Sequence, residues 1–186
     1  MELSILICTL PARANMFHSL LETIHSQIQG TGPKAFQEIE IISDRNRFNT
    51  VGYKRDQLLR QSTGNFIVYI DDDDRILDGY IHDIYHGIKN NPDVDCIGIS
   101  GYMTTNGQDR RDWHISREYG SWFEQDKVYY RTPNHISPVK GAIAKQVGFK
   151  DQNFSEDYEY SMGILPMLHK EFKINRQLYH YNYNSK

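Results

Sequence analysis

The stretch FIVYIDDDDRI, residues 66–76, runs from five apolar or aromatic residues directly into four consecutive aspartates. A short apolar run of this kind predicts a strand that is covered on both faces. Adjacent carboxylates repel one another unless a cation or hydrogen-bond donors neutralise them. Because aspartate oxygens are natural ligands of magnesium, manganese and calcium, the run indicates a divalent-cation site facing a cleft. A solvated acidic turn that caps the following helix is the simpler alternative.

The residues on either side of this stretch alternate between predicted strands and predicted helices. Strands are expected at 3–9, 38–43, 65–70 and 94–103. Helices are expected between them at 16–29, 51–61 and 78–89, with Asn15 and Asp78 as N-caps of the first and third. This alternation predicts an α/β fold with a mostly parallel central sheet and helices on both faces.

The pattern changes in the second half of the chain. Asn106-Gly107 is a strong signal for a hairpin turn. One helix is predicted at 137–148, and another from Ser155 to beyond Leu165. A tyrosine-rich segment, QLYHYNYN (177–184), closes the sequence. We therefore expect one domain whose second half builds onto the sheet of the first.

Composition argues against several classes of protein. The 186 residues are 24% charged and 39% apolar with a net charge of −3, which is typical of one soluble domain and argues against general nucleic-acid binding. No apolar run is long enough to span a membrane, and the acidic start does not resemble a secretory signal. Cys8 and Cys96 lie in apolar runs, so we expect buried free thiols and a cytoplasmic location.

Polar residues follow each of the first three predicted strands. Thr9 ends the first strand, Asp44 follows the second, and residues 71–74 follow the third. Ligands of open α/β sheets bind at the carboxyl ends of the parallel strands. These residues are therefore expected to converge on one ligand site.

A second acidic pair lies in NFSEDYEYSMGIL, residues 153–165. Glu156 and Asp157 fall in the first turn of the helix predicted to begin at Ser155. Acidic residues there complement the helix dipole, which is a sufficient structural explanation for the pair alone. Metal-assisted group transfer also requires a base for the incoming nucleophile, so the pair is a candidate for that role.

Four segments, ILICTLPAR, EIEIISD, GYKRDQLLRQSTGNFIVYIDDDD and NFSEDYEYSM, occur in an order and spacing known from one enzyme family. They resemble the family 2 glycosyltransferases of GT-A fold over residues 3–80 and 134–165. The resemblance implies a single GT-A glycosyltransferase domain over 1–186. It also implies a nucleotide-sugar-binding half at 1–100 and an acceptor-side half at 101–186.

The resemblance implies a role for each matching residue. Asp157 is expected to be the general base with Glu156 supporting it, and Asp44 to bond a uracil edge with Arg55 nearby. The residues implied to bind the donor are Thr9, Leu10, Asp44, Arg55, Asp71 and Asp72. The implied ligands of a Mn²⁺ or Mg²⁺ ion are Asp73, Asp71 and His180.

The implied activity is a metal-dependent, inverting transfer of a sugar from a nucleotide-diphosphate donor, UDP by preference, to a hydroxyl acceptor. A glycan, a lipid-linked sugar and a modified nucleobase in DNA are all open as acceptors. Nucleic acid is expected only in that role, through a basic patch of Lys54, Arg55, Arg110, Arg111 and Arg117. The alternatives are a catalytically silent nucleotide-sugar-binding domain and a nucleotidyl- or phosphoryl-transfer enzyme.

The sequence departs from the family pattern in several places. The usual Pro-Thr-Tyr-Asn-Arg after the first strand is rearranged around Arg13, and Asp56 replaces an asparagine. The Gln-x-x-Arg-Trp motif of the processive synthases is absent, so processive polymer synthesis is not expected. His135, Trp113 and Trp122 are additional candidates for substrate contact, with packing as the simpler explanation of each.

Overall fold

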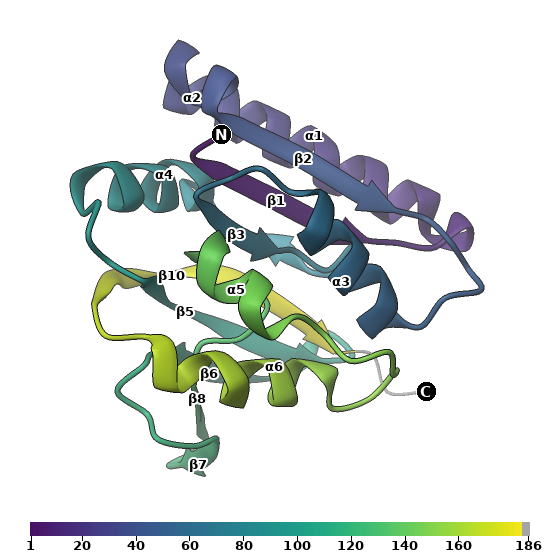
Figure 1. The fold of residues 1–186 in the computed structure, drawn as a ribbon. Coiled ribbons are helices and arrows are strands. Elements are labelled where there is room, and N and C mark those ends of the chain that lie inside the picture. The colour runs from purple at the N-terminus through teal and green to yellow at the C-terminus, as the bar shows by residue number, and fades with distance from the viewer. Residues whose placement is uncertain (184–186) are drawn as a thin grey trace.

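A computed structural model describes residues 1–183 and joins their strands in one ten-stranded sheet (Figure 1). The strand order is β2-β1-β3-β9-β5-β6-β8-β7, and β10 lies beside β5 and pairs with the short β4 (Arg75–Ile76). The strand β1 (Leu3–Cys8) runs parallel to both β2 (Ile39–Asp44) and β3 (Phe66–Tyr69). The predicted α/β fold with parallel central strands is confirmed.

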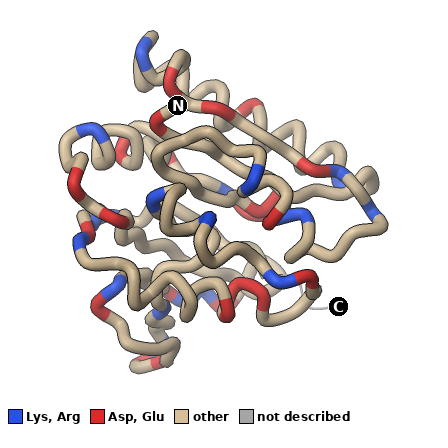
Figure 2. Tube along the Cα trace, in the orientation of Figure 1, with Lys and Arg blue, Asp and Glu red and all other residues tan. Residues whose placement is uncertain are grey.

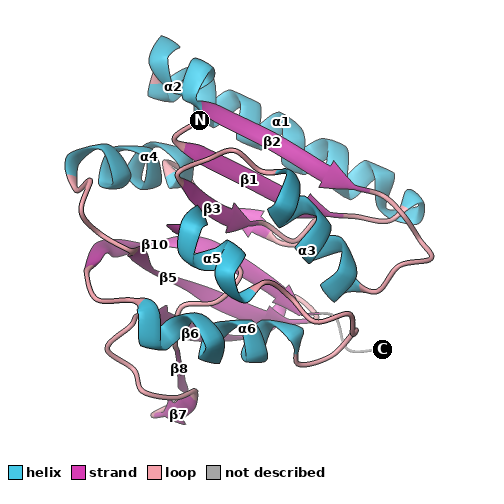
Figure 3. Ribbon diagram, in the orientation of Figure 1, coloured by secondary structure: helices cyan, strands magenta, loops and turns pink. Residues whose placement is uncertain are grey.

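Helices cover both faces of this sheet, as predicted (Figure 3). They are α1 (Ala14–Thr31), α2 (Pro33–Glu38), α3 (Val51–Gln61), α4 (Tyr80–Asn90), α5 (Gly141–Val147) and α6 (Glu156–Ile164). Two separate hydrophobic clusters lie under them, because alternate residues of each strand face opposite sides. In β1, Ile5 belongs to the cluster that includes α1 and α4, whereas Leu6 belongs to the cluster that includes α3, α5 and α6.

The second half adds strands to the far edge of the sheet. They are β5 (Cys96–Thr105), β6 (Gln108–Ile115), β7 (Phe123–Gln125) and β8 (Val128–Arg131), followed later by β9 (Val139–Lys140) and β10 (Glu171–Tyr183). The turn between β5 and β6 has positive φ angles at Asn106 (51°) and Gly107 (75°), which confirms the predicted hairpin. The tyrosine-rich segment becomes the end of β10, and its last residue, Asn184, lies outside the described residues.

Several predicted element boundaries are wrong. The helix expected at 137–148 begins only at Gly141, because Val139–Lys140 form β9 and pair with β3 and β5. A 3₁₀ turn, Pro11–Arg13, leads into α1 in place of an Asn15 cap. Gly79, with φ of 73°, precedes α4 in place of an Asp78 cap.

The helix predicted from Ser155 forms but differs at both ends. Ser155 precedes α6 in a left-handed conformation, with φ of 64°, and its side chain makes no cap bond. The α-helix ends at Ile164, and a 3₁₀ turn at Leu165–Met167 accommodates Pro166.

Two composition-based expectations can be compared with the structure. Both cysteines are free thiols, as predicted; Cys96 is buried as expected, whereas Cys8 is only half-buried. Burial raises the pKa of the Cys8 thiol to about 12. Among the described residues, none of the helices is long and apolar enough to cross a membrane.

Candidate active site

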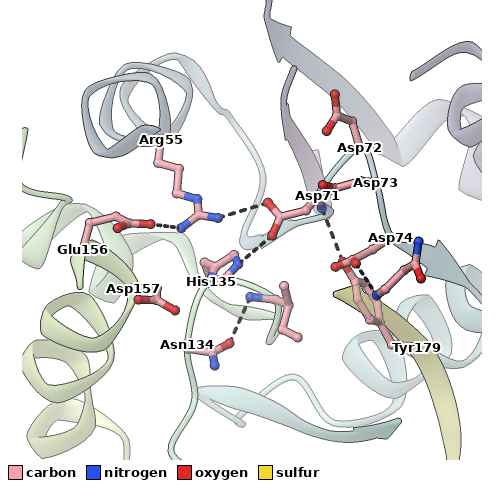
Figure 4. A network of polar contacts seen from close by, with 12 residues as sticks. Arg55, Asp71, Asp72, Asp73, Asp74, Asn134, His135, Glu156, Asp157 and Tyr179 are labelled. Atoms are coloured by element: carbon pink, nitrogen blue, oxygen red, sulfur yellow. Dashed lines mark hydrogen bonds and ion pairs between the residues drawn. The ribbon is translucent and has the colours of Figure 1, made fainter. Parts of the chain in front are cut away.

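The four aspartates after β3 and the short β4 (Arg75–Ile76) that follows lie at the carboxyl edge of the central strands, and each carboxylate has different partners (Figure 4). Asp71 accepts from Arg55 Nη2 at 3.0 Å and lies 3.2 Å from His135 Nε2. Burial alone would raise the pKa of Asp71, but the charges of Arg55 and His135 outweigh it and hold that pKa well below its usual range. Asp71 therefore stays ionised at the centre of the site.

Arg55 connects three elements of the fold. Its side chain comes from α3, is almost fully buried, and donates from Nη1 to Glu156 Oε1 at 2.6 Å as well as to Asp71. Burial lowers the pKa of Arg55, yet the carboxylates around it, Asp71 foremost, raise that pKa above its usual value. The resemblance implied a place near the nucleobase for Arg55. The structure places its side chain between the end of β3 and the start of α6, where Glu156 begins the helix.

Asp72 and Asp73 share one cation. Thr9 donates from Oγ1 to Asp72 at 2.6 Å, and Arg13 Nη1 lies 2.7 Å from Asp72 Oδ1 and 3.0 Å from Asp73 Oδ2. Asp72 is buried and Asp73 is half-buried. Thr9 and Asp72 thus converge as the strand-end argument predicted. The rearranged segment after β1 also brings Arg13 to the aspartates, which that argument did not predict.

Asp74 points to the opposite side of the run. Its carboxylate accepts from the Tyr179 hydroxyl at 2.8 Å and from the Asn182 backbone N–H at 2.8 Å, both from β10. Burial, together with the negative charge of Asp71, raises the pKa of Asp74 well above its usual range. The alternative of a solvated acidic turn is wrong, because Asp72 and Asp74 are buried and α4 begins only at Tyr80.

The fit of these residues to a divalent ion depends on Asp73. Within residues 1–183, no three histidine, cysteine, aspartate or glutamate side chains form a group that could hold a metal by themselves. Burial and the charges of Asp71 and Asp72 raise the pKa of Asp73 despite Arg13, so this carboxylate lies in an excess of negative charge. Mg²⁺ is commonly held by one or two carboxylates plus substrate phosphates. The residues therefore fit an ion that takes its remaining ligands from a bound diphosphate.

The other two expected metal ligands lie in different surroundings. Both oxygens of Asp71 already contact Arg55 and His135. His180 stacks on the Tyr102 ring at 4.4 Å and lies 2.7 Å from Thr104 Oγ1. It lines a separate cavity with Arg75, and the structure does not bring it together with Asp71 and Asp73. Burial and nearby arginines lower the pKa of His180.

Two cavities meet at this network. The first, which we call the donor cavity, has a volume of about 660 Å³ and is lined by Thr9, Leu10, Arg13, Lys54 and Asp71–Asp73, among others. The second, which we call the acceptor-side cavity, has a volume of about 630 Å³ and is lined by Asp157, His135, Trp113, Trp122, Tyr129 and Arg131, among others. Arg55, Asp71 and Glu156 line both, so the network forms their shared wall.

Asp157 lies on the acceptor side of that wall, where Figure 4 shows it between Glu156 and His135. Glu156 is buried and bonded to Arg55, whereas Asp157 is half-buried and accepts from the Tyr158 N–H at 2.8 Å. Within residues 1–183, no basic side chain lies within ion-pair distance of Asp157. Of the two acidic residues that begin α6, Glu156 is thus held in an ion pair within the described part of the chain and Asp157 is not.

Asp44 lies at the end of β2, where its backbone carbonyl accepts from the Thr9 N–H at 2.9 Å. The Asp44 carboxylate accepts from the Asn46 N–H at 2.7 Å, and Asp44 is not among the residues that line the donor cavity. Lysine and arginine positions are spread over the trace and interspersed with acidic ones (Figure 2). Lys54 and Arg55 are buried, Arg110 and Arg111 pair with acidic neighbours, and Arg117 donates to a backbone carbonyl.

Sequence reasoning missed Lys54 and Tyr181 as parts of the donor cavity. Lys54 was grouped with surface cations, although its position one residue before Arg55 on a buried helix face was a usable signal. Tyr181 lines both cavities, and burial raises its pKa to about 12. His135, left open between substrate contact and packing, contacts Asp71 and also lines the acceptor-side cavity.

The central sheet, with helices on both faces and polar residues at its strand ends, defines a protein of GT-A fold. Residues 19–151 match the profile of Glycosyl transferase family 2, and the chain belongs to that family. No curated protein matches the chain significantly.

Solved structures of S. aureus TarS are similar in fold. TarS 1–349 has a TM-score of 0.71 at 15% identity and covers 98% of this chain and 60% of its own length. TarS 1–349 in complex with UDP-GlcNAc has a TM-score of 0.67 at 14% identity, covering 100% of this chain and 60% of that one. Its complex with UDP has a TM-score of 0.67 at 14% identity, with coverages of 98% and 60%. The chain thus spans 60% of the length of these structures, and at this identity the likeness concerns the fold.

Proposed function

We propose that this chain transfers a sugar from a UDP-linked donor to a hydroxyl acceptor with inversion at the anomeric carbon. The observation that carries the proposal is the shared wall of the donor and acceptor-side cavities, formed by Arg55, Asp71 and Glu156. Family membership supports glycosyl transfer, and the TarS complexes with UDP-GlcNAc and UDP support a uridine nucleotide.

On the donor side, Asp73 is the residue that would hold a Mn²⁺ or Mg²⁺ ion. Such an ion supplies positive charge that stabilises the diphosphate leaving group. Thr9 fixes Asp72, and Arg55 with His135 fixes Asp71, so neighbouring carboxylates are held in place before a ligand binds. Arg13, which pairs with Asp72 and Asp73, adds a cation at the same place.

On the acceptor side, Asp157 is the proposed general base. It takes the proton of the acceptor hydroxyl while that oxygen forms a bond to the anomeric carbon and the bond to the diphosphate breaks. Glu156 cannot share this role while it is paired with Arg55, and it instead fixes the start of α6 beside Asp71. One displacement from the side opposite the leaving group inverts the anomeric configuration.

The first test is thermal unfolding with Mn²⁺ and UDP, GDP, CMP or ATP, on the wild type, Asp73→Ala and Asp93→Ala. Asp93 is an exposed aspartate remote from the donor cavity and serves as the matched control. We expect UDP to stabilise the wild type and Asp93→Ala only with Mn²⁺, and to stabilise Asp73→Ala much less. Stabilisation by ATP alone would favour phosphoryl transfer, and no shift with any nucleotide would contradict the proposal.

The second test measures slow hydrolysis of UDP-sugars, with water as the acceptor. Asp157→Asn should bind UDP as the wild type does, yet lose about 10²–10⁴-fold in rate, because a general base contributes that much. NMR of the freshly released sugar should show the inverted anomer. Retention would remove the role proposed for Asp157, and normal UDP binding without turnover in the wild type would indicate a silent binding domain.

A further inference from the structure

Lys54 is a buried cation whose hydrogen-bonding capacity is only partly used. It lies in the first turn of α3, is 4% exposed, and donates from Nζ to the Thr9 carbonyl oxygen at 2.7 Å. Within residues 1–183 this carbonyl is its one hydrogen-bond acceptor, and no carboxylate oxygen lies within 4.0 Å. A lysine ammonium carries three donors. Two of them therefore lack a protein partner.

This arrangement is costly for the folded protein without a ligand. A buried charge is tolerated when a counter-charge and hydrogen bonds compensate for lost hydration. The adjacent Arg55 meets that condition with two carboxylates, Asp71 and Glu156. Lys54 has one carbonyl oxygen, so its environment is incomplete in a way that an added oxygen acceptor would correct.

The place of that missing acceptor is the donor cavity, which Lys54 lines together with Thr9, Leu10 and Asn49. We propose that Lys54 binds the donor nucleotide by giving its two remaining hydrogens to an oxygen of that nucleotide. The inference rests on the proposed function, because it assumes that the donor cavity takes a nucleoside diphosphate. It assigns to the donor site a residue that the family resemblance did not assign.

An ammonium group only donates hydrogen bonds, which restricts the chemistry of its partner. A carbonyl oxygen of the base and a phosphoryl oxygen of the diphosphate both qualify. An amino group directed at Lys54 would instead place two donors face to face and leave both buried without a partner. The two oxygen sources can be separated by ligands that carry only one of them.

The experiment titrates UDP, uridine and inorganic pyrophosphate by calorimetry at fixed Mn²⁺ into the wild type, Lys54→Met and Lys34→Met. Methionine keeps the length of the side chain and removes the charge. Lys34, on α2, has an exposed side chain remote from the donor cavity and controls for loss of one positive charge. We expect Lys54→Met to weaken UDP binding about 10- to 100-fold, the effect of one charged hydrogen bond, and Lys34→Met to leave it unchanged.

The smaller ligands identify the atom. Weaker uridine binding with unchanged pyrophosphate binding assigns Lys54 to the base, and the reverse assigns it to the diphosphate. Unchanged UDP affinity in Lys54→Met overturns the inference while leaving the proposed function intact. Failure of UDP to bind the wild type would instead overturn the proposed function.

Unfolding without ligand separates binding from support of the Thr9 segment. Removing an uncompensated buried charge should leave the apo midpoint unchanged or raise it. A lowered midpoint together with unchanged UDP affinity would show that Lys54 only tethers Thr9 to α3. If Lys54→Met does not fold, Lys54→Gln keeps one donor for the Thr9 carbonyl, and its UDP affinity should fall in the same way.

Discussion

Replacing Arg55 by methionine should destabilise the protein by about 3–5 kcal/mol, the cost of removing one partner from a buried ion pair. The guanidinium is almost fully buried and bonds Glu156 at 2.6 Å and Asp71 at 3.0 Å. Methionine fills a similar volume but leaves both carboxylates without their main counter-charge. Of these two carboxylates, His135 contacts Asp71 within the described residues and not Glu156, so it cannot compensate Glu156.

The assay is urea unfolding at pH 7, with thermal unfolding beside it. For a chain of this size, each kcal/mol shifts the midpoint by about 2–4 °C, so a loss of about 6–20 °C is expected. Arg60→Met is the matched control, since Arg60 lies on the same helix with a half-exposed side chain and pairs with Asp56. An exposed pair of this kind contributes about 0–1 kcal/mol.

A rescue experiment tests the cause of the destabilisation. Adding Asp71→Asn and Glu156→Gln to Arg55→Met removes all three charges, and most of the lost stability should return. If Arg55→Met is no more destabilising than Arg60→Met, or if the triple variant is less stable than Arg55→Met alone, the buried network is not what holds α3, β3 and α6 together.

Three further predictions follow from particular contacts. The pKa of Asp95 is lowered in the folded protein, because three hydrogen bonds to its carboxylate outweigh the effect of burial. The stability that this carboxylate contributes is therefore complete above its unfolded pKa and is lost as the pH falls through its folded pKa. Asp95→Asn should therefore cost about 1–3 kcal/mol in urea unfolding at pH 7, and progressively less as the pH falls below about 4; a cost that stays the same over that fall in pH would contradict this. Gly52→Ala should cost about 1–3 kcal/mol, because a Cβ there would lie 1.9 Å from the Lys150 carbonyl oxygen, whereas Gly30→Ala, with nothing within 4 Å, should be harmless or stabilising. His180→Ala should leave Mn²⁺-dependent stabilisation by UDP unchanged. If the variant lost that stabilisation, His180 would be a metal ligand after all.

Local signals were sufficient to predict the first half of the fold. The buried runs of β1 and β3 are apolar because helices cover both faces, and α3 was predicted at its observed bounds, with Thr50 accepting from the Tyr53 N–H at 3.1 Å. The same strand-end reasoning correctly brought Thr9 to Asp72. In these cases the pattern that produces the element is contained within a few neighbouring residues.

The errors lie where distant segments decide the structure. Val139–Lys140 form a strand only because β3 and β5 leave a place between them, and no local pattern distinguishes them from a first helical turn. The family resemblance implied that His180 is a metal ligand. Its register in β10, opposite Tyr102 of β5 and Arg75 of β4, sends the imidazole toward Tyr102 and Thr104.

In the aspartate run, too, some features follow from neighbouring residues and others from distant segments. Its position after a buried strand predicted that the charges needed partners, and this holds for all four residues. Which partner each one has depends on residues 59 to 108 positions away for Asp72 and Asp74, and on α3 and the segment before β9 for Asp71. Asp71 is neutralised by Arg55 and Asp74 is held by β10. Asp73, whose one ion pair within residues 1–183 is with the half-exposed Arg13, is therefore the carboxylate that we expect to change partner when a ligand binds.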